Sequence, residues 1–296
     1  MRRWYKGNLH THTTNSDGDS SPSTVAAWYA DNGYDFLALS DHDRLTDPAT
    51  VDLGRPSSFL LIRAEELSPG DVHVNGFGLT ATVAPVAAAS VAEVIQRNAD
   101  AVRAAGGVAS INHPNYRWAV SAADLLAVRD IRLLEIYNGE PSVNNLGGAG
   151  RPSAEALWDI VLGAGRRLYG LAVDDAHHFE RWGPAYSNPG RGFVCVEAER
   201  LTEAAILEAL ERGAFYASTG VELSGLELEP AGSIRLEIAA RGDAAYTTTF
   251  VAGGRTLDVQ TGSAARYRPR GEPYVRVRVD DSNGRSAWLQ PIFAGG

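Results

Sequence analysis

The sequence predicts an α/β protein in which strands and helices alternate around a mainly parallel sheet or barrel, followed by a small antiparallel β domain. Through the first two-thirds of the chain, short apolar runs alternate with segments of helical period. After Thr219-Gly220 the helical period disappears, and short alternating runs separated by Gly, Pro, Asp and Asn follow. We therefore expect two domains, residues 1–218 and 219–296.

Length and composition agree with a folded protein. The chain has 296 residues, 44% hydrophobic and 21% charged, which excludes a disordered, collagen-like or low-complexity protein. It carries 27 basic and 36 acidic residues, a formal net charge of −9. Binding to nucleic acid by neutralisation of phosphates is therefore disfavoured.

Apolar runs and turn residues place the elements in chain order. The predicted strands of the first domain are residues 5–10, 36–40, 59–63, 73–79, 108–112, 133–137, 169–174 and 193–197. The predicted helices begin at Ser21-Pro22, Ser90 and Ser121 and span 155–162 and 202–212. Ser90 with Glu93 predicts a capping box. The second domain is predicted to contain strands at 221–228, 234–240, 246–251, 274–280 and 287–292.

The single cysteine and the apolar runs bear on the compartment. Cys195 cannot form an internal disulfide and is interpreted as a buried strand residue. No run approaches the roughly 20 apolar residues of a spanning helix, and the N-terminus does not lead into a secretory h-region. We expect a cytoplasmic protein with no membrane partner.

Histidine is distributed unevenly, with all seven residues between His10 and His178. His10 and His12 close the first strand in Asn8-Leu9-His10-Thr11-His12. Residues two apart in a strand point to the same face, so these imidazoles are suited to gripping one metal ion.

Further metal-binding residue types recur where other predicted strands begin or end. In barrels of alternating strands and helices, the C-terminal strand ends meet at one face, so residues distant in sequence converge there. The additional candidate ligands are Asp17, His42, Glu66, His73, His113, Asp175 and His177. Four neighbouring carboxylates are expected to orient imidazoles or to be solvated: Asp41, Asp43, Glu65 and Asp174. His178 is expected to point away from the metal and to support one of the ligands.

These motifs resemble those of the PHP (polymerase and histidinol phosphatase) metallohydrolases. The resemblance runs from about residue 5 to 218. It rests on Asn8-Leu9-His10-Thr11-His12, Ser16-Asp17-Gly18, Ser40-Asp41-His42, the Glu66 segment, Asn112-His113-Pro114 and Asp175-Ala176-His177. The phrases 158–159, 169–178, 215–220 and 284–292 look like the branch that includes carbaryl hydrolases.

The resemblance implies a distorted seven-stranded, TIM-like (β/α) barrel holding two or three divalent metals. By motif, His10, His12, Glu66 and Asp175 would hold one metal. Glu66, bridging, would hold a second with His73 and His113. Asp17, His42 and His177 would hold the third. The residues expected to take part in catalysis are His10, Asp17, Glu66, Asp175 and His177.

Imidazoles and carboxylates without thiolates suit Mn, Fe or Zn. Paired metals lower the pKa of a shared water and stabilise attacking and leaving oxygens, and a third suits the several oxygens of a phosphate. We expect a hydrolase acting on a small phosphate ester such as a nucleotide. The alternatives are a carboxylic or carbamate esterase, an oligonucleotide exonuclease, and a non-catalytic metal-binding accessory protein.

Substrate contacts are predicted at four further residues. Arg117 and Trp118 directly follow the His113 motif, and Tyr137 ends a strand. Arg151 closes a glycine-rich loop before a helix whose N-terminus could receive an anion. A flexible loop with a surface arginine is the alternative for Arg151. The oligomeric state has no signal in the sequence.

Overall fold

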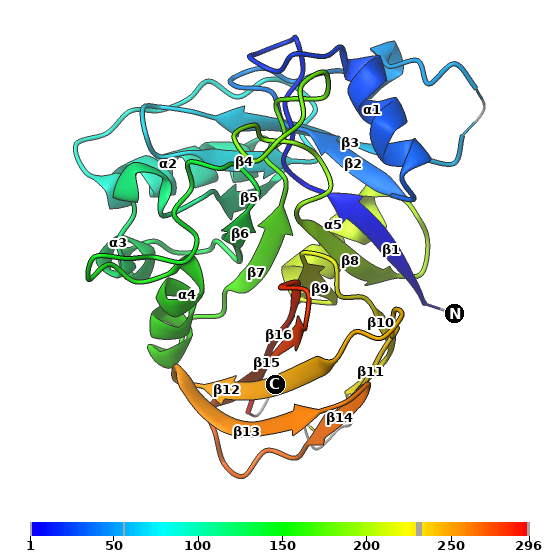
Figure 1. The fold of residues 1–296 in the computed structure, drawn as a ribbon. Coiled ribbons are helices and arrows are strands. Elements are labelled where there is room, and N and C mark those ends of the chain that lie inside the picture. The colour runs from blue at the N-terminus through cyan, green and yellow to red at the C-terminus, as the bar shows by residue number, and fades with distance from the viewer. Residues whose placement is uncertain (1, 56, 229–232, 295–296) are drawn as a thin grey trace.

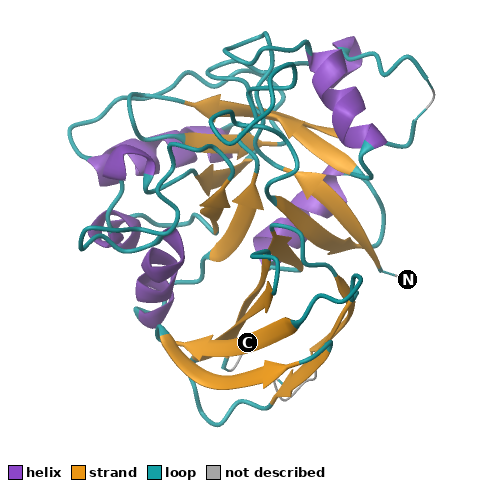
Figure 2. Ribbon diagram, viewed as in Figure 1, coloured by secondary structure: helices purple, strands orange, loops and turns teal. Residues whose placement is uncertain are grey.

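The computed structural model describes residues 2–55, 57–228 and 233–294. Its strands are β1 (Arg3–Asn8), β2 (Phe36–Leu39), β3 (Leu60–Leu67), β4 (Val74–Phe77), β5 (Val108–Ile111), β6 (Leu133–Asn138), β7 (Tyr169–Val173), β8 (Phe193–Ala198), β9 (Phe215–Ser218), β10 (Leu223–Leu228), β11 (Ile234–Ile238), β12 (Tyr246–Ala252), β13 (Arg255–Thr261), β14 (Ala264–Tyr267), β15 (Tyr274–Asp281) and β16 (Ser286–Phe293). Its α-helices are α1 (Pro22–Asp31), α2 (Val91–Ala104), α3 (Ala122–Ala127), α4 (Ala154–Gly163) and α5 (Glu203–Arg212). Figure 2 shows the helices arranged around strands in the upper part of the view, while strands and loops make up its lowest part.

One large sheet organises the first domain (Figure 1). It has 13 strands in the order β13-β12-β15-β16-β9-β8-β1-β2-β3-β4-β5-β6-β7. β1, β2 and β3 are mutually parallel, as are β5, β6 and β7, while β4 runs antiparallel between the two groups. The six parallel strands therefore run in one direction and bring their C-terminal ends to one face.

The expected barrel is corrected in one respect, because the named strands of the sheet do not close on themselves: among the described residues, β7 pairs with neither β1 nor β8. At the C-terminal face, however, Asp175 N–H donates to His10 O and His12 N–H to Ala176 O, each at 2.9 Å. Further down, the Gln290 side chain of β16 accepts from Gly170 N at 2.7 Å and donates to Gly170 O at 2.8 Å. β8, β9 and β16 thus keep the sheet open below a seam whose segments carry the predicted ligands His10, His12 and Asp175.

The C-terminal strands β12, β13, β15 and β16 continue the large sheet, whereas the other three form a separate sheet. β16 pairs antiparallel with β9, and β15, β12 and β13 follow. A second, three-stranded sheet has the order β10-β11-β14. The predicted antiparallel character of this region is confirmed, and the division at residue 218 stays a prediction. The sequence analysis predicted no strand at β9, β13 or β14. β9 and β14 have only four residues, and much of β13 is exposed and polar.

The predicted helices are confirmed, with N-caps that accept backbone N–H groups. Ser21, Ser90, Ser121, Ser153 and Thr202 each accept from the residue three positions later. The reciprocal capping box forms at Ser121 and Asp124. At the Ser90 site that was predicted to form one, the structure records only the hydroxyl accepting from Glu93 N.

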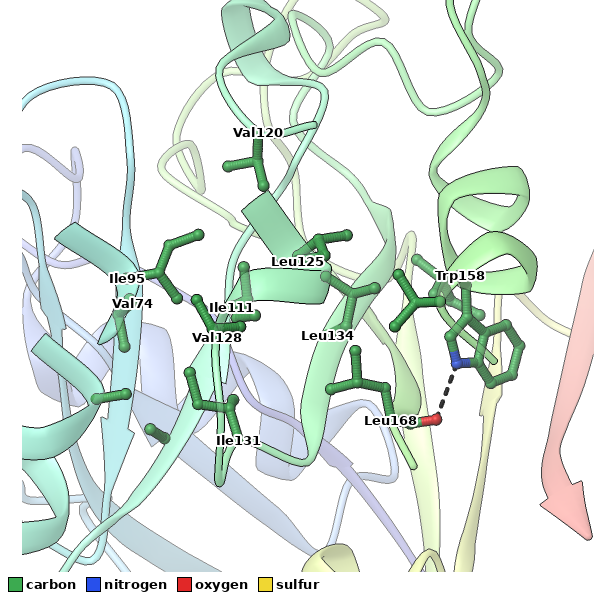
Figure 3. Packing of buried hydrophobic residues seen from close by; sticks show 14 of the residues in the cluster. Val74, Ile95, Ile111, Val120, Leu125, Val128, Ile131, Leu134, Trp158 and Leu168 are labelled. Atoms are coloured by element: carbon green, nitrogen blue, oxygen red, sulfur yellow. Dashed lines mark hydrogen bonds between the residues drawn. The ribbon is translucent and has the colours of Figure 1, made fainter. Parts of the chain in front are cut away.

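Buried apolar side chains fill the space between helices and sheet. Figure 3 shows part of the cluster between α2, α3, α4 and the strands β4 to β6, where Trp158 donates its indole N–H to Leu168 O at 2.9 Å. Cys195 is buried on β8, as predicted, and burial raises the pKa of its thiol to about 12. Among the described residues, no helix combines the length and apolarity needed to cross a membrane.

A buried ion pair fastens the C-terminal strands to α4. Arg276 of β15 is 2% exposed, and its Nε and Nη2 donate to the two carboxylate oxygens of Asp159 at 2.6 Å each. Its Nη1 lies 2.7 Å from Glu155 Oε1. Asp159 therefore binds one edge of the guanidinium through two hydrogen bonds, and Glu155 lies at the remaining nitrogen.

Replacing Arg276 with alanine should destabilise the whole chain. The change takes away both hydrogen bonds to Asp159, whose side chain is 11% exposed, while Glu155 keeps its pair with Arg278. Removing one partner of a buried pair costs about 3–5 kcal/mol. Urea unfolding followed by circular dichroism would measure the loss. Arg255→Ala, an exposed arginine of β13, is the matched control and should change the free energy of unfolding by less than about 0.5 kcal/mol. Equal effects of the two changes would contradict this account.

Candidate metal centre

The nine predicted metal ligands meet at the C-terminal face of the parallel strands. His10 and His12 follow β1, His42 follows β2, and Glu66 lies near the end of β3. His73 precedes β4, His113 follows β5, and Asp175 and His177 follow β7. Asp17 lies in the loop between β1 and α1. A cavity of about 270 Å³ opens over this cluster.

Glu66 lies at the centre of the cluster. The carboxylate is 1% exposed, and five histidine nitrogens surround it. The distances to its Oε2 are 3.2 Å from His10 Nε2, 3.3 Å from His12 Nε2 and 3.1 Å from His42 Nδ1; those to its Oε1 are 3.0 Å from His73 Nδ1 and 3.3 Å from His113 Nε2. One carboxylate thus touches groups from four separate strand ends, because His10 and His12 both follow β1.

Asp175 supplies a second buried carboxylate beside Glu66. Its Oδ1 lies 3.2 Å from His10 Nε2, 3.1 Å from His12 Nε2 and 3.7 Å from His177 Nδ1. Its backbone has φ 50°, a left-handed conformation that is uncommon outside glycine and that concentrates at functional sites. The bond from Asp175 N to His10 O holds this conformation at the seam of the sheet.

Asp17 forms a third, more open corner of the centre. Its carboxylate oxygens lie 3.6 Å from His12 Nδ1, 3.6 Å from His42 Nε2 and 3.4 Å from His177 Nε2. The side chain is 56% exposed, so this corner faces the cavity mouth. The residue groups that could hold a metal ion are His12, Asp17, His42 and His177; His10, His12 and Glu66; and His42, Glu66 and His73. His12 and His42 each belong to two of these groups, whereas the resemblance assigns each of them to a single metal ion.

Opposite charges shift the pKa values of these groups strongly. Burial alone would raise the pKa of Glu66, but the imidazoles of His10 and His73 hold it well below its usual range. Burial would lower the pKa of His12, but hydrogen bonds to Asp175 and Glu66 raise it to about 9. The pKa values of His10 and His73 are raised as well, so without a metal, protons on these three imidazoles offset the carboxylates, whereas burial lowers the pKa of His42.

The donor set and one orphaned atom fit a cation. His10 Nε2 is fully buried and has no hydrogen-bond partner, although carboxylate oxygens of Glu66 and Asp175 lie 3.2 Å away. A nitrogen held between two carboxylates without a hydrogen bond is the arrangement expected for metal ligands. Imidazole and carboxylate donors suit Zn, Mn or Fe, as the sequence indicated.

Sequence reasoning missed Glu135 of β6, which organises the ligands from behind. Its Oε1 lies 2.7 Å from His10 Nδ1, and its Oε2 accepts His113 N–H at 2.8 Å and Asn138 Nδ2–H at 2.9 Å. Asn138 in turn donates to Asp175 Oδ2 at 3.1 Å. A carboxylate inside the apolar run Leu133-Leu134-Glu135-Ile136 was the available signal, since a buried charge needs partners.

Two predicted supporting carboxylates hold backbone near the ligands. Asp41 accepts from Thr13 N at 2.8 Å and Ser16 Oγ at 2.8 Å, which fixes the loop that carries Asp17. Asp174 accepts from Tyr29 Oη at 2.7 Å and from three backbone N–H groups of residues 190–192. Burial outweighs these bonds and raises the pKa of Asp174 to about 6.

The remaining neighbours of the candidate ligands, Asp43, Glu65 and His178, have different surroundings. Asp43 accepts Ser68 N–H at 2.9 Å, and Ser68 Oγ lies 2.6 Å from His42 Nδ1. Glu65 accepts Val83 N–H, and burial raises its carboxyl pKa to about 7. His178, expected to point elsewhere, instead lines the cavity.

The four predicted substrate contacts do not line the metal cavity in the described structure. Arg117 Nη1 lies 2.9 Å from Asp71 Oδ1, the Arg151 guanidinium lies 5.1 Å from the ring of Trp118, and Tyr137 faces Trp288. The cavity walls that the sequence did not single out are Tyr116, Glu140, Ser142, Ala185 and Ser187. No arginine or lysine is among the described lining residues.

The comparison with solved structures confirms the PHP resemblance at the level of the fold. A two-domain protein from Bacteroides vulgatus, described as containing a predicted PHP-like metal-dependent phosphoesterase, is similar over 94% of this chain and 90% of its own. The sequence identity is 16% and the TM-score 0.51. The chain thus has the fold of a PHP-like protein. The carbaryl-hydrolase branch stays a prediction.

Two further structures are similar over a smaller share of this chain. A candidate metal-dependent phosphoesterase from Bifidobacterium adolescentis is 17% identical over 70% of this chain and 96% of its own, with a TM-score of 0.43. The lesion-specific endonuclease EndoQ from Pyrococcus furiosus is 14% identical over 71% of this chain and 56% of its own, also with a TM-score of 0.43. No family model matches the chain, and no curated protein matches its sequence.

Metal binding should release protons and strengthen with rising pH. The pKa of His12 is raised to about 9 in the metal-free chain, so below that pH a metal ion must displace its proton. Calorimetric titration with Zn²⁺ or Mn²⁺ at pH 6, 7 and 8, in buffers of different ionisation enthalpy, would count the protons. Affinity independent of pH across this range would contradict the protonated imidazole cluster.

Glu135→Gln should weaken metal binding while leaving the chain folded. The amide keeps the size of the side chain but loses the charge that orients His10, and such supporting changes cost about 10–100-fold in affinity. Glu65→Gln is the matched control, because it alters a buried carboxyl that receives a backbone N–H and contacts no imidazole. Competition with a chromophoric chelator measures both variants; equal affinities would argue against the role of Glu135.

Proposed function

We propose that this chain is a divalent-metal-dependent hydrolase of small phosphate esters. The observation that carries the proposal is that five imidazole nitrogens surround the buried Glu66 carboxylate beside a cavity that Asp17, Asp175 and His177 also line. Structural metal sites are normally closed by four ligands, whereas this cluster has more donors than one ion needs and opens to solvent. That contrast favours catalysis over a non-catalytic accessory role.

The ligand assignment in this proposal is the one that the resemblance implies. His10, His12, Glu66 and Asp175 would hold one ion, Glu66, His73 and His113 a second, and Asp17, His42 and His177 a third. Two or three bound ions would activate water at neutral pH and offset the negative charge of a phosphate ester. Mn, Zn and Fe all suit these donors.

The residues of the chain prepare this centre before any substrate arrives. The Glu135 carboxylate accepts from His10 Nδ1, which assigns the proton to that nitrogen in the neutral ring and leaves Nε2 free toward Glu66 and Asp175. Glu135 also accepts His113 N–H. One buried carboxylate thus fixes donors assigned to two different ions.

The cavity walls limit the substrate. Its described lining contains no arginine or lysine, so these walls provide neither side chain for additional phosphates. Tyr116, Ser142 and Ser187 can donate hydrogen bonds, while Glu140 adds a negative charge beside the site. A volume of about 270 Å³ suits a compact ester better than a polymer. These features favour a small ester with one phosphoryl group.

A carboxylic or carbamate ester is the second candidate. The same activated water would attack an acyl carbon, and the scarcity of cationic side chains around the cavity suits an uncharged ester. An oligonucleotide exonuclease is less favoured, because the chain carries a net charge of −9. EndoQ, one of the structurally similar proteins, is named as a lesion-specific endonuclease, so nucleic-acid substrates belong in the test.

Substrate assays on metal-supplemented protein should separate these candidates. We expect turnover of nucleoside monophosphates or p-nitrophenyl phosphate to exceed that of phosphodiesters, aryl carbamates, aryl acetates and single-stranded oligonucleotides. His10→Ala and Asp175→Ala should each reduce the turnover by about 10²–10³-fold, the range for removing an electrostatic group from an active site. Asp243→Ala, which alters an exposed carboxylate, is the control.

Three outcomes would count against the proposal. Unchanged activity in both His10→Ala and Asp175→Ala would remove the catalytic role of the cluster. Fewer than two divalent ions per chain after supplementation, by elemental analysis, would remove the multinuclear mechanism. Faster turnover of the carbamate or acetate would favour the esterase alternative.

A further inference from the structure

A second cavity lies apart from the metal centre, between the first domain and the C-terminal strands. Its volume is about 640 Å³, and its walls come from the loop after β6, the first turn of α4, and β15 and β16. It shares no lining residue with the metal cavity. Small-molecule sites favour such junctions and commonly measure 300–1,000 Å³.

Apolar side chains in the walls could hold a ring. Tyr137 stacks against Trp288, with ring centroids 6.2 Å apart and planes inclined by 27°. Leu146 is 90% exposed, the largest fraction among the exposed large hydrophobic residues described. A leucine left in water beside an aromatic wall offers contact area that the fold itself does not use.

Polar atoms in the walls have hydrogen-bonding capacity to spare. Trp288 is 6% exposed, and its buried Nε1 has no hydrogen-bond partner. Around it the lining offers neutral groups, including Asn144, Ser153 and Thr219. Buried polar groups are normally paired, so the indole N–H is a donor that the described part of the chain leaves unused in a residue of the cavity wall.

The charges of this cavity are already balanced. Arg278 Nη1 lies 2.8 Å from Glu155 Oε2, and its Nε lies 2.9 Å from Asp280 Oδ1. A charged ligand would have to compete with these pairs, whereas an uncharged one would not.

We propose that this cavity, lined by Tyr137, Leu146 and Trp288, is a binding site for an uncharged, ring-bearing molecule with hydroxyl or carbonyl groups. Glycosides and nucleosides share this chemistry. The ring of the bound molecule would lie against Leu146 and Tyr137. Its oxygens would form hydrogen bonds with neutral polar groups such as Asn144 and Ser153.

The site is linked to the metal centre through hydrogen bonds. Asn145, which lines the cavity, accepts Asn138 N–H at 2.9 Å and donates to Asn138 O at 2.8 Å. Asn138 donates to Asp175 Oδ2 at 3.1 Å. Occupancy of the site therefore changes the metal affinity of the centre. An accompanying change in turnover rests on the proposed hydrolase function, but binding does not.

Calorimetry on the metal-loaded full chain tests the proposal, with phenyl β-D-glucoside and adenosine as neutral probes and benzoate as the anionic comparison. Both neutral probes should bind more tightly than benzoate. Leu146→Asp should weaken phenyl β-D-glucoside binding by about tenfold. This factor corresponds to the free energy gained when the ligand covers one exposed leucine side chain. Val259→Asp, which alters another exposed hydrophobic residue, should leave binding unchanged.

Tyr137→Phe keeps the ring and removes the hydroxyl. We expect the affinity for phenyl β-D-glucoside to fall about two- to tenfold, which corresponds to the loss of one hydrogen bond. Saturating phenyl β-D-glucoside should shift the metal dissociation constant of the wild type and not that of Leu146→Asp. The proposal is overturned if neither neutral probe binds at about 10 mM, if Leu146→Asp binds like the wild type, or if benzoate binds most tightly. Probe binding without any hydrolase activity would support this site and refute only the proposed function.

Discussion

The constraint on which the rest of the structure depends is the burial of Glu66 among five imidazoles. A carboxylate that is 1% exposed is costly without compensating charge, so each strand end that supplies a histidine is held to a fixed position. Asp175 and Glu135 extend the same network to β7 and β6. The parallel strands, the open seam and the cavity are arranged around this group of charges.

Local patterns in the sequence predicted the helices, most strands and the nine candidate ligands that the fold brings to one face. Helix caps such as Ser121 are local signals, and strand-end histidines such as His113 carry their chemistry in their residue type. Glu135 could not be assigned in the same way, because its role depends on a side chain 125 residues away. The position of Tyr137 beside Trp288 depends likewise on how β16 enters the sheet, which no local pattern records.

The open edge of the sheet is the reason why the expected barrel is not closed. Four parallel pairings build the curved part, but β8, β9 and β16 occupy the space where the last strand would meet the first. Gln290 imitates a strand there, since its amide group both donates to and accepts from the backbone of Gly170. The C-terminal strands thus complete the wall of the first domain, and the Arg276 ion pair fastens them to α4.

The seam between the ends of β1 and β7 has a consequence for how the protein is made. His12 and Asp175 are separated by 163 residues, so a growing chain exposes its first two histidines long before their carboxylate partner leaves the ribosome. At synthesis rates of about 5–20 residues per second, that interval lasts roughly ten seconds or more. The centre is assembled only when the first domain is nearly complete, so a chain truncated before β7 would lack it.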